Sequence, residues 1–141
     1  MILIDVIDED GAPTGVQKTM TEIHDQGLLH RAVHIWIYNK DGQILFQLRA
    51  MRKFNYPGLW DISAAGHVDA GEAPMVAALR EAYEELGLKI SAKQLVKIGE
   101  RVVSNNIPEI NIVIMKLTVY TSYLMTEISR LSLSWMVRSK H

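Results

Sequence analysis

Four glutamates in the middle of the chain have the residue type and the spacing of a cation site. Glu81, Glu84 and Glu85 stand at positions i, i+3 and i+4, and Glu72 precedes them in a segment that contains glycine. On a helix the three share one face, where each like-charge pair costs roughly 0.2–0.5 kcal/mol. A divalent cation removes that repulsion, and Mg²⁺ commonly bridges protein carboxylates to phosphates. The pattern predicts a Mg²⁺ or Mn²⁺ phosphate site; the alternative is a solvated acidic helix face.

A helix over residues 74 to 86 is predicted to carry these carboxylates. Pro74 suits a first helical turn, and Gly87 suits the position just past a helix end. At 100° per residue the apolar side chains gather opposite the carboxylates. That inward side is predicted to consist of Met75, Val76, Leu79, Tyr83 and Leu86. Ala77 and Ala78 are expected to flank the carboxylates and to leave room for ions and phosphates.

Arg80 lies at the edge of the same acidic face. It is within reach of Glu84 one turn further on and of Glu72 in the preceding loop. We expect Arg80 to orient these carboxylates and not to contact a substrate.

The segment from Gly66 to Leu88 fits the Nudix box, G-x5-E-x7-R-E-U-x-E-E-x-G-U, where U is apolar. The fixed positions are occupied by Gly66, Glu72, Arg80, Glu81, Glu84, Glu85 and Gly87, with Ala82 and Leu88 at U. The chain therefore resembles the Nudix pyrophosphohydrolases. The resemblance implies an α+β fold, a Nudix-like α/β/α sandwich with a mixed sheet and the box as loop-helix-loop.

The resemblance also implies an activity, hydrolysis of a diphosphate linkage in a nucleoside diphosphate or a derivative by metal-activated water. The implied catalytic residues are Glu81, Glu84, Glu85 and Arg80. The three glutamates and the backbone near Gly66 would hold Mg²⁺ or Mn²⁺, while Glu72 and Gly87 would be structural. Which glutamate acts as the base stays open.

Before the box, the chain is similar to type I isopentenyl-diphosphate isomerases and their hydrolase relatives. The similarity covers roughly residues 28 to 90 and rests on three runs: L-H-R-A ending at Ala32, Q-x-R-A ending at Ala50 and P-G-L-W ending at Trp60. Where those isomerases have a catalytic cysteine, this chain has Ala65, which cannot exchange a proton. An isomerase-like protein is therefore a disfavoured alternative, and a non-catalytic nucleotide-binding module is another.

The isomerases also hold a metal through histidines, and they use two glutamates in a later strand. This chain has His24 and His30, with a spacing one residue shorter than theirs, and His67 beside the box glycine. At the later positions it offers Glu109 and Asn111. Whether the three histidines bind a metal stays open.

Contacts to a substrate are predicted in the loop before the box strand. Arg49, Arg52 and Lys53 form a basic cluster suited to phosphate oxygens. Tyr56 is the better candidate for stacking, because Trp60 starts an apolar strand and is expected in the core.

Composition agrees with one small domain over residues 1–141. The 141 residues are 48% hydrophobic, with 15 basic and 16 acidic side chains, so no nucleic acid polymer is expected as a partner. The absence of cysteine excludes disulfides and thiolate sites within these residues. The acidic N-terminus and the lack of a long apolar run predict a cytoplasmic protein without a membrane segment.

Strands are predicted on both sides of the box. Segments 2–7 and 16–23 are expected to form an N-terminal hairpin extension within residues 1–27. Segments 30–38 and 44–48 flank an Asp-Gly turn and are expected as central sheet strands. Further strands are predicted at 60–65, 95–103 and 110–120.

The C-terminal residues depart from the family pattern. Trp135 and Met136 resemble the tryptophan before the last helix of many Nudix domains, and five residues follow them. The C-terminal helix is therefore expected to be short or absent. Apolar surface left uncovered there would favour a homodimer.

Overall fold

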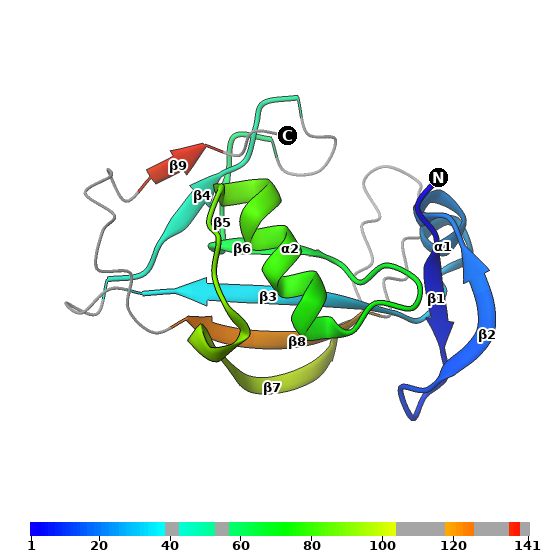
Figure 1. Ribbon diagram of the computed structural model, residues 1–141. Helices are drawn as coiled ribbons and strands as arrows, with labels where there is room; N and C mark the ends of the chain where they lie inside the picture. The colour runs from blue at the N-terminus through cyan, green and yellow to red at the C-terminus, as the bar shows by residue number, and fades with distance from the viewer. Residues whose placement is uncertain (39–42, 53–56, 104–117, 126–135, 139–141) are drawn as a thin grey trace.

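A four-stranded mixed sheet forms the centre of the protein (Figure 1). This computed structural model describes residues 1–38, 43–52, 57–103, 118–125 and 136–138. The strand order is β6 (Ala64–His67), β3 (His30–Ile37), β8 (Thr118–Met125) and β7 (Leu95–Val103). β3 and β8 run parallel, and the other two pairs are antiparallel. The strands predicted at 30–38 and 95–103 are confirmed by β3 and β7.

A smaller sheet lies beside the first. Its order is β5 (Trp60–Asp61), β4 (Phe46–Leu48) and β9 (Met136–Arg138). β3 is a central strand as predicted. β4 belongs to this second sheet, so the prediction that segment 44–48 is also a strand of the central sheet is wrong. Tyr38 pairs with Ile44 in an antiparallel bridge, while the turn at 39–42 lies outside the described residues. The strand predicted at 60–65 is divided into β5 and β6.

Ser63 explains that division. Its buried hydroxyl accepts a hydrogen bond from the Ile37 amide at 2.9 Å and donates one to the Leu45 carbonyl at 2.6 Å. The residue thus ties the end of β3 to the segment that enters β4, at the point where the chain passes from one sheet to the other.

The N-terminal hairpin is present, but its second strand is shorter than predicted. β1 (Ile4–Ile7) pairs with β2 (Pro13–Lys18), and helix α1 (Met20–Gln26) follows where a strand to residue 23 was expected. Thr19 and Glu22 form a reciprocal capping box at the start of α1, which fixes the helix there. Ile23 on α1 is fully buried.

Helix α2 (Pro74–Leu86) has the predicted bounds and lies across β6 and β3 (Figure 1). Its inward face differs from the prediction. Val76 and Tyr83 are exposed, and the fully buried residues of the helix are Ala77, Ala78 and Ala82. Because alanine has the smallest side chain that helices favour, it lets the helix backbone approach the sheet closely. Ala77 and Ala78 therefore belong to the core and do not line a space for ions.

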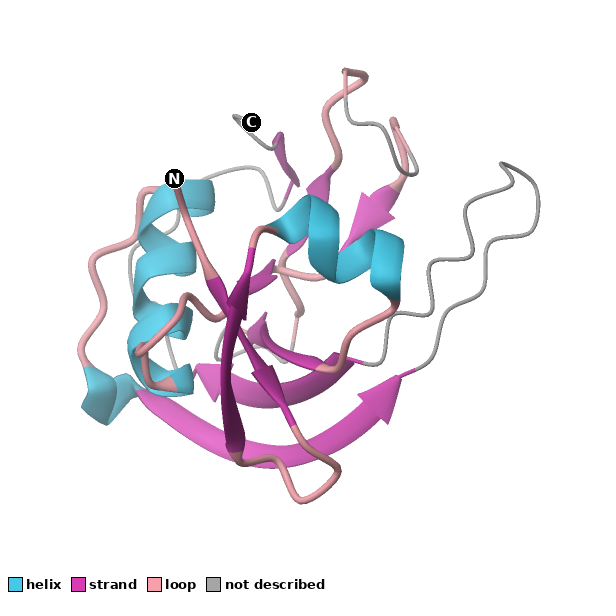
Figure 2. Ribbon diagram, turned by 90° about the vertical axis from the view of Figure 1, so that its right-hand side faces the viewer, coloured by secondary structure: helices cyan, strands magenta, loops and turns pink. Residues whose placement is uncertain are grey.

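The remaining core is aliphatic. Around the alanines it contains Val33, Ile35, Ile37, Leu45, Ala64, Val68 and Leu95, with Met75, Leu79, Leu86, Leu88 and Ile90 packed against it. A short 3₁₀ helix, η1 (Ala92–Gln94), leads from α2 into β7. Figure 2 shows α1 and α2 as separate helices above the curved strands.

The hairpin holds the loop that precedes α2. The Ala70 amide donates to the Leu3 carbonyl at 2.8 Å, and the Gly71 amide donates to Asp5 Oδ2 at 2.8 Å. The N-terminal extension thus fixes the segment that carries Glu72 into the site.

The last predicted elements are described only in part. Thr118 to Tyr120 of the strand predicted at 110–120 open β8, whereas Glu109, Asn111 and Trp135 lie outside the described residues. Among the residues that the structure describes, no helix has the length and apolar character needed to cross a membrane.

Candidate active site

Gly66 brings the sheet backbone against the first helical glutamate. A Cβ atom added at Gly66 would overlap the carboxyl group of Glu81. Only glycine allows this approach. The backbone of β6 and the carboxylate therefore lie in direct contact, as oxygen ligands of one cation would.

Arg80 links the loop to the helix. Its Nε and Nη2 donate to the two oxygens of Glu72, both at 2.9 Å, and its Nη1 donates to Glu81 Oε1 at 2.8 Å. A longer bond of 3.4 Å reaches Glu84, and Nη2 also donates to the His67 carbonyl at 2.9 Å. The predicted pairing of Arg80 with Glu72 and Glu84 is present. Bidentate contact of this kind gives strong, directional bonds.

Burial and neighbouring charges shift the pKa values of Glu81 and Glu72 in opposite directions. Burial raises the pKa of Glu81 to about 7, helped by the charges of Glu85 and Glu84 and opposed by Arg80. Burial also works against ionisation of Glu72, but the hydrogen bonds from Arg80 and the Asp69 amide outweigh it and lower the pKa. Glu72 is therefore a fixed anion of the scaffold, and Glu81 is a carboxyl group that gains a proton near neutral pH.

Glu85 has a partner that sequence reasoning missed. Gln47 of β4 is 3% exposed, and its Nε2 donates a hydrogen bond to Glu85 Oε2. A polar residue in an otherwise apolar strand segment was the available signal. The second sheet thus contributes directly to the site.

The carboxylates fit a hard cation. The charges of Glu84 and Glu85 lie close enough to raise the pKa of Glu81, and the side chain of Glu84 is 51% exposed. Such oxygen donors at an accessible face suit Mg²⁺ or Mn²⁺. We name Glu72, Glu81, Glu84 and Glu85 the carboxylate cluster.

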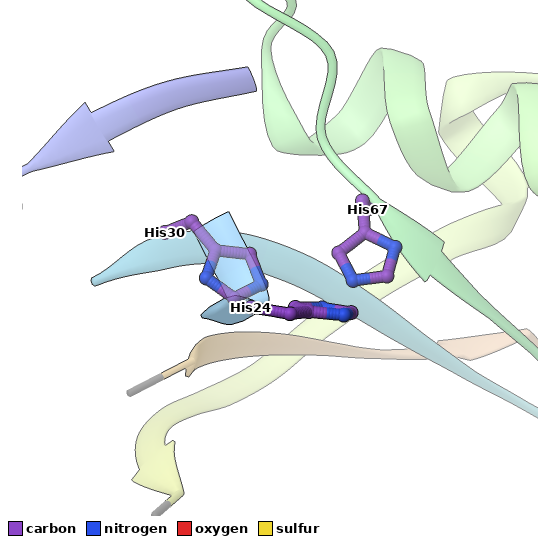
Figure 3. A group of neighbouring side chains, drawn as sticks. All are labelled: His24, His30 and His67. Carbon is purple, nitrogen blue, oxygen red and sulfur yellow. The ribbon is translucent and has the colours of Figure 1, made fainter. Parts of the chain in front are cut away.

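The side chains of three histidines, one of which is His67, lie close together (Figure 3). His24 of α1, His30 of β3 and His67 of β6 form this histidine triad, and their potential ligand atoms lie within 4.8 Å of one another. The ring centroids of His30 and His67 are 5.3 Å apart and stacked. His30 Nδ1 lies 2.9 Å from the Leu28 carbonyl, which favours the proton on Nδ1 and the lone pair on Nε2. Spacing left the meeting of these residues open; the structure brings them together.

The predicted substrate contacts are only partly described. Arg49 forms an ion pair with Asp61 at 3.0 Å, and Arg52 is exposed. Lys53 and Tyr56 lie outside the described residues. Trp60 is 51% exposed, so its prediction as a core residue is wrong. It lies in a two-residue strand at the edge of the smaller sheet, where the described residues offer little to cover it.

Comparison with known proteins agrees with this fold and this site. The NUDIX domain matches residues 28–119. The chain belongs to the Nudix family, and the predicted α+β Nudix fold is confirmed.

Two relatives place the chain near the predicted branch. It is 46% identical over 95 residues to Nudix hydrolase 3 of Arabidopsis thaliana, covering 67% of this chain and 12% of that protein. It is 38% identical over 90 residues to an isopentenyl-diphosphate Delta-isomerase of Streptomyces griseus, covering 64% of this chain and 46% of that protein. The chain thus spans less than half the length of these curated relatives.

Solved structures support the fold. The crystal structure of DR0079 from Deinococcus radiodurans has a TM-score of 0.71 and 21% identity, over 94% of this chain and 76% of that one. The MutT protein from Methanosarcina mazei has a TM-score of 0.57 and 20% identity, over 76% and 70%.

Proposed function

We propose that this protein hydrolyses a diphosphate linkage in a nucleoside diphosphate or a derivative of one, with Mg²⁺ or Mn²⁺ at the carboxylate cluster. The observation that carries the proposal is the direct contact of Glu81 with the Gly66 backbone, beside Glu84 and Glu85 on the same helix. A pure binding module has no need for this complete set of carboxylates. Membership of the Nudix family supports the same activity.

The residues divide the work. A cation held by Glu81, Glu84 and Glu85 would screen the diphosphate and lower the pKa of a water from about 15.7 in bulk. Arg80 positions Glu81 and Glu72 through hydrogen bonds and does not itself contact the substrate. Glu81 must lose its proton before it serves as a ligand, because a carboxylic acid binds cations poorly. Catalysis then consists mainly of positioning and charge compensation.

An isomerase is the second candidate. The similarity to an isopentenyl-diphosphate Delta-isomerase and the histidine triad favour it. Ala65 counts against it, because that position lacks a group able to donate or accept a proton. The triad itself, with three imidazole side chains, suits a metal such as Zn²⁺.

A panel of substrates tests the proposal. Native protein and the Glu85→Gln variant are incubated with Mg²⁺ and pooled nucleotide sugars, nucleoside diphosphates, dinucleotides, oxidised nucleotides and small prenyl diphosphates, and products are separated by ion exchange. Glu9→Gln, at an exposed hairpin turn, is the matched control. We expect cleavage by the native and control proteins and a loss of about 100-fold or more in Glu85→Gln. Folded native protein that cleaves no member would contradict the proposal, and an isomerised prenyl diphosphate would favour the second candidate.

The organisation of the chain stays a prediction at three points. Residues 1–141 are proposed as one domain because the N-terminal hairpin bonds to the loop before α2. The cytoplasmic location and the homodimer rest on the sequence alone.

A further inference from the structure

Gln47 is a buried amide that faces a carboxylate of the site. Its side chain is 3% exposed on β4, and its Nε2 donates to Glu85 Oε2. The reverse orientation of the amide would set two oxygens against each other, so electrostatics favours the orientation with nitrogen toward Glu85.

The other end of the amide gains little from burial. Gln47 Oε1 is buried, and no described residue donates a hydrogen bond to it. A buried acceptor without a donor opposes stability, and an apolar side chain of the same size would avoid that cost. The position therefore contributes something other than stability.

Glu81 and Glu85 have different hydrogen-bond donors. Arg80 brings a positive charge to Glu81, whereas Gln47 brings a neutral donor to Glu85. A neutral donor fixes one carboxylate oxygen without bringing a positive charge that would compete with a cation. It also holds the side chain against repulsion from Glu81, whose proton affinity the Glu85 charge raises.

We propose that Gln47 is a positioning residue that orients the Glu85 carboxylate for the divalent cation, so that the second sheet contributes to metal affinity. The inference rests on the proposed function of the carboxylate cluster. Outer-sphere partners of this kind typically change metal affinity by about 10–100-fold.

Titration with Mn²⁺ tests the proposal without a substrate. Free Mn²⁺ is measured by electron paramagnetic resonance in native protein, Gln47→Met and the control Gln17→Met, with melting temperatures recorded in EDTA. Gln17 also donates to a carboxylate, Asp5, but in the exposed hairpin. We expect Gln47→Met to bind Mn²⁺ about 10-fold or more weakly while its metal-free melting temperature is unchanged or raised. Gln17→Met should bind like the native protein.

Native Mn²⁺ affinity in folded Gln47→Met would overturn the proposal. If that variant does not fold, Gln47→Asn, which keeps the amide but is one methylene too short to reach Glu85, is titrated in its place with the same expected loss. The result is separable from the substrate panel. Weak Mn²⁺ binding by Gln47→Met together with no cleavage by native protein would retain the positioning residue and reject the hydrolase.

Discussion

The carboxylate cluster and the histidine triad meet at His67 but differ in construction. The backbone carbonyl of His67 accepts a bond from Arg80 at 2.9 Å, and its ring belongs to the triad. Three carboxylates of the cluster come from one face of α2, whereas the triad takes one side chain each from α1, β3 and β6. Oxygen donors suit Mg²⁺, and imidazoles suit later transition metals. One strand, β6, thus borders two groups of side chains with different chemistry.

This difference explains why the sequence predicted that the carboxylates converge but left the convergence of the histidines open. Three ligands on a helix obey a fixed spacing, so their convergence follows from local geometry. Three ligands on separate elements converge only after the sheet and the hairpin have assembled.

The largest effect on the carboxylate cluster is expected from a substitution that removes the close approach of β6 to Glu81. In Gly66→Ala the added methyl group must displace the Glu81 carboxylate. We expect Mn²⁺ affinity and Mg²⁺-dependent hydrolysis to fall about 100-fold, with a loss of about 1–3 kcal/mol in stability from overpacking. Gly99→Ala is the control, since among the described residues, apart from the two chain neighbours of Gly99, none has an atom within 4 Å of the added Cβ. Equal Mn²⁺ affinity in the two variants would show that Glu81 is not a ligand.

The pH dependence should distinguish the sites next. Burial raises the pKa of Glu81 from 4.5 to about 7, so its stabilising effect on the metal-free protein is complete below pH 4.5 and is lost as the pH rises through 7. Mg²⁺ requires the ionised form, so its affinity should rise about tenfold per pH unit up to pH 7 and then level off. Thermal unfolding from pH 4 to 8, with EDTA or Mg²⁺, measures both trends. Glu81→Gln should flatten them, and a native-like slope in that variant would assign the titration to another group.

A change in the triad should have the smallest effect on hydrolysis. His24→Ala removes the one imidazole that α1 contributes to the triad, and none of the carboxylates of the cluster comes from α1. We expect hydrolysis with Mg²⁺ to change by less than about threefold, since separated sites act independently. When Co²⁺ is added as a probe of the triad, the visible absorption band of histidine-bound Co²⁺ that we expect in the native protein should be lost in this variant. A loss of hydrolysis comparable to that in Gly66→Ala would mean that both sites form one catalytic centre.

Local signals in the sequence predicted α2 well. Pro74 and Gly87 mark its ends by rules that need no tertiary contact. The inward face was wrong because hydrophobicity favours Val76 and Tyr83, while the distance to the sheet requires alanine. Helix α1 was also missed, although Thr19 and Glu22 carry the capping-box pattern.

Contacts between distant segments could not be predicted. Gln47 and Glu85 are far apart in sequence and meet only because the second sheet packs beside α2. The bond from Gly71 to Asp5 likewise depends on the hairpin reaching the loop before the helix. In both cases the residue type gave no preference among many possible partners.

The proposed hydrolysis is tested most directly by following the oxygen atom of the attacking water. Native protein and Glu85→Gln are incubated with the pooled diphosphates and Mg²⁺ in ¹⁸O-labelled water, and the ¹⁸O content of the products is measured by mass spectrometry. Attack by water on phosphorus predicts one labelled oxygen in a phosphate-bearing product for each bond cleaved, at a rate that depends on Mg²⁺ and Glu85. Cleavage without label in any phosphate group, or an isomerised prenyl product with its diphosphate intact and unlabelled, would contradict it.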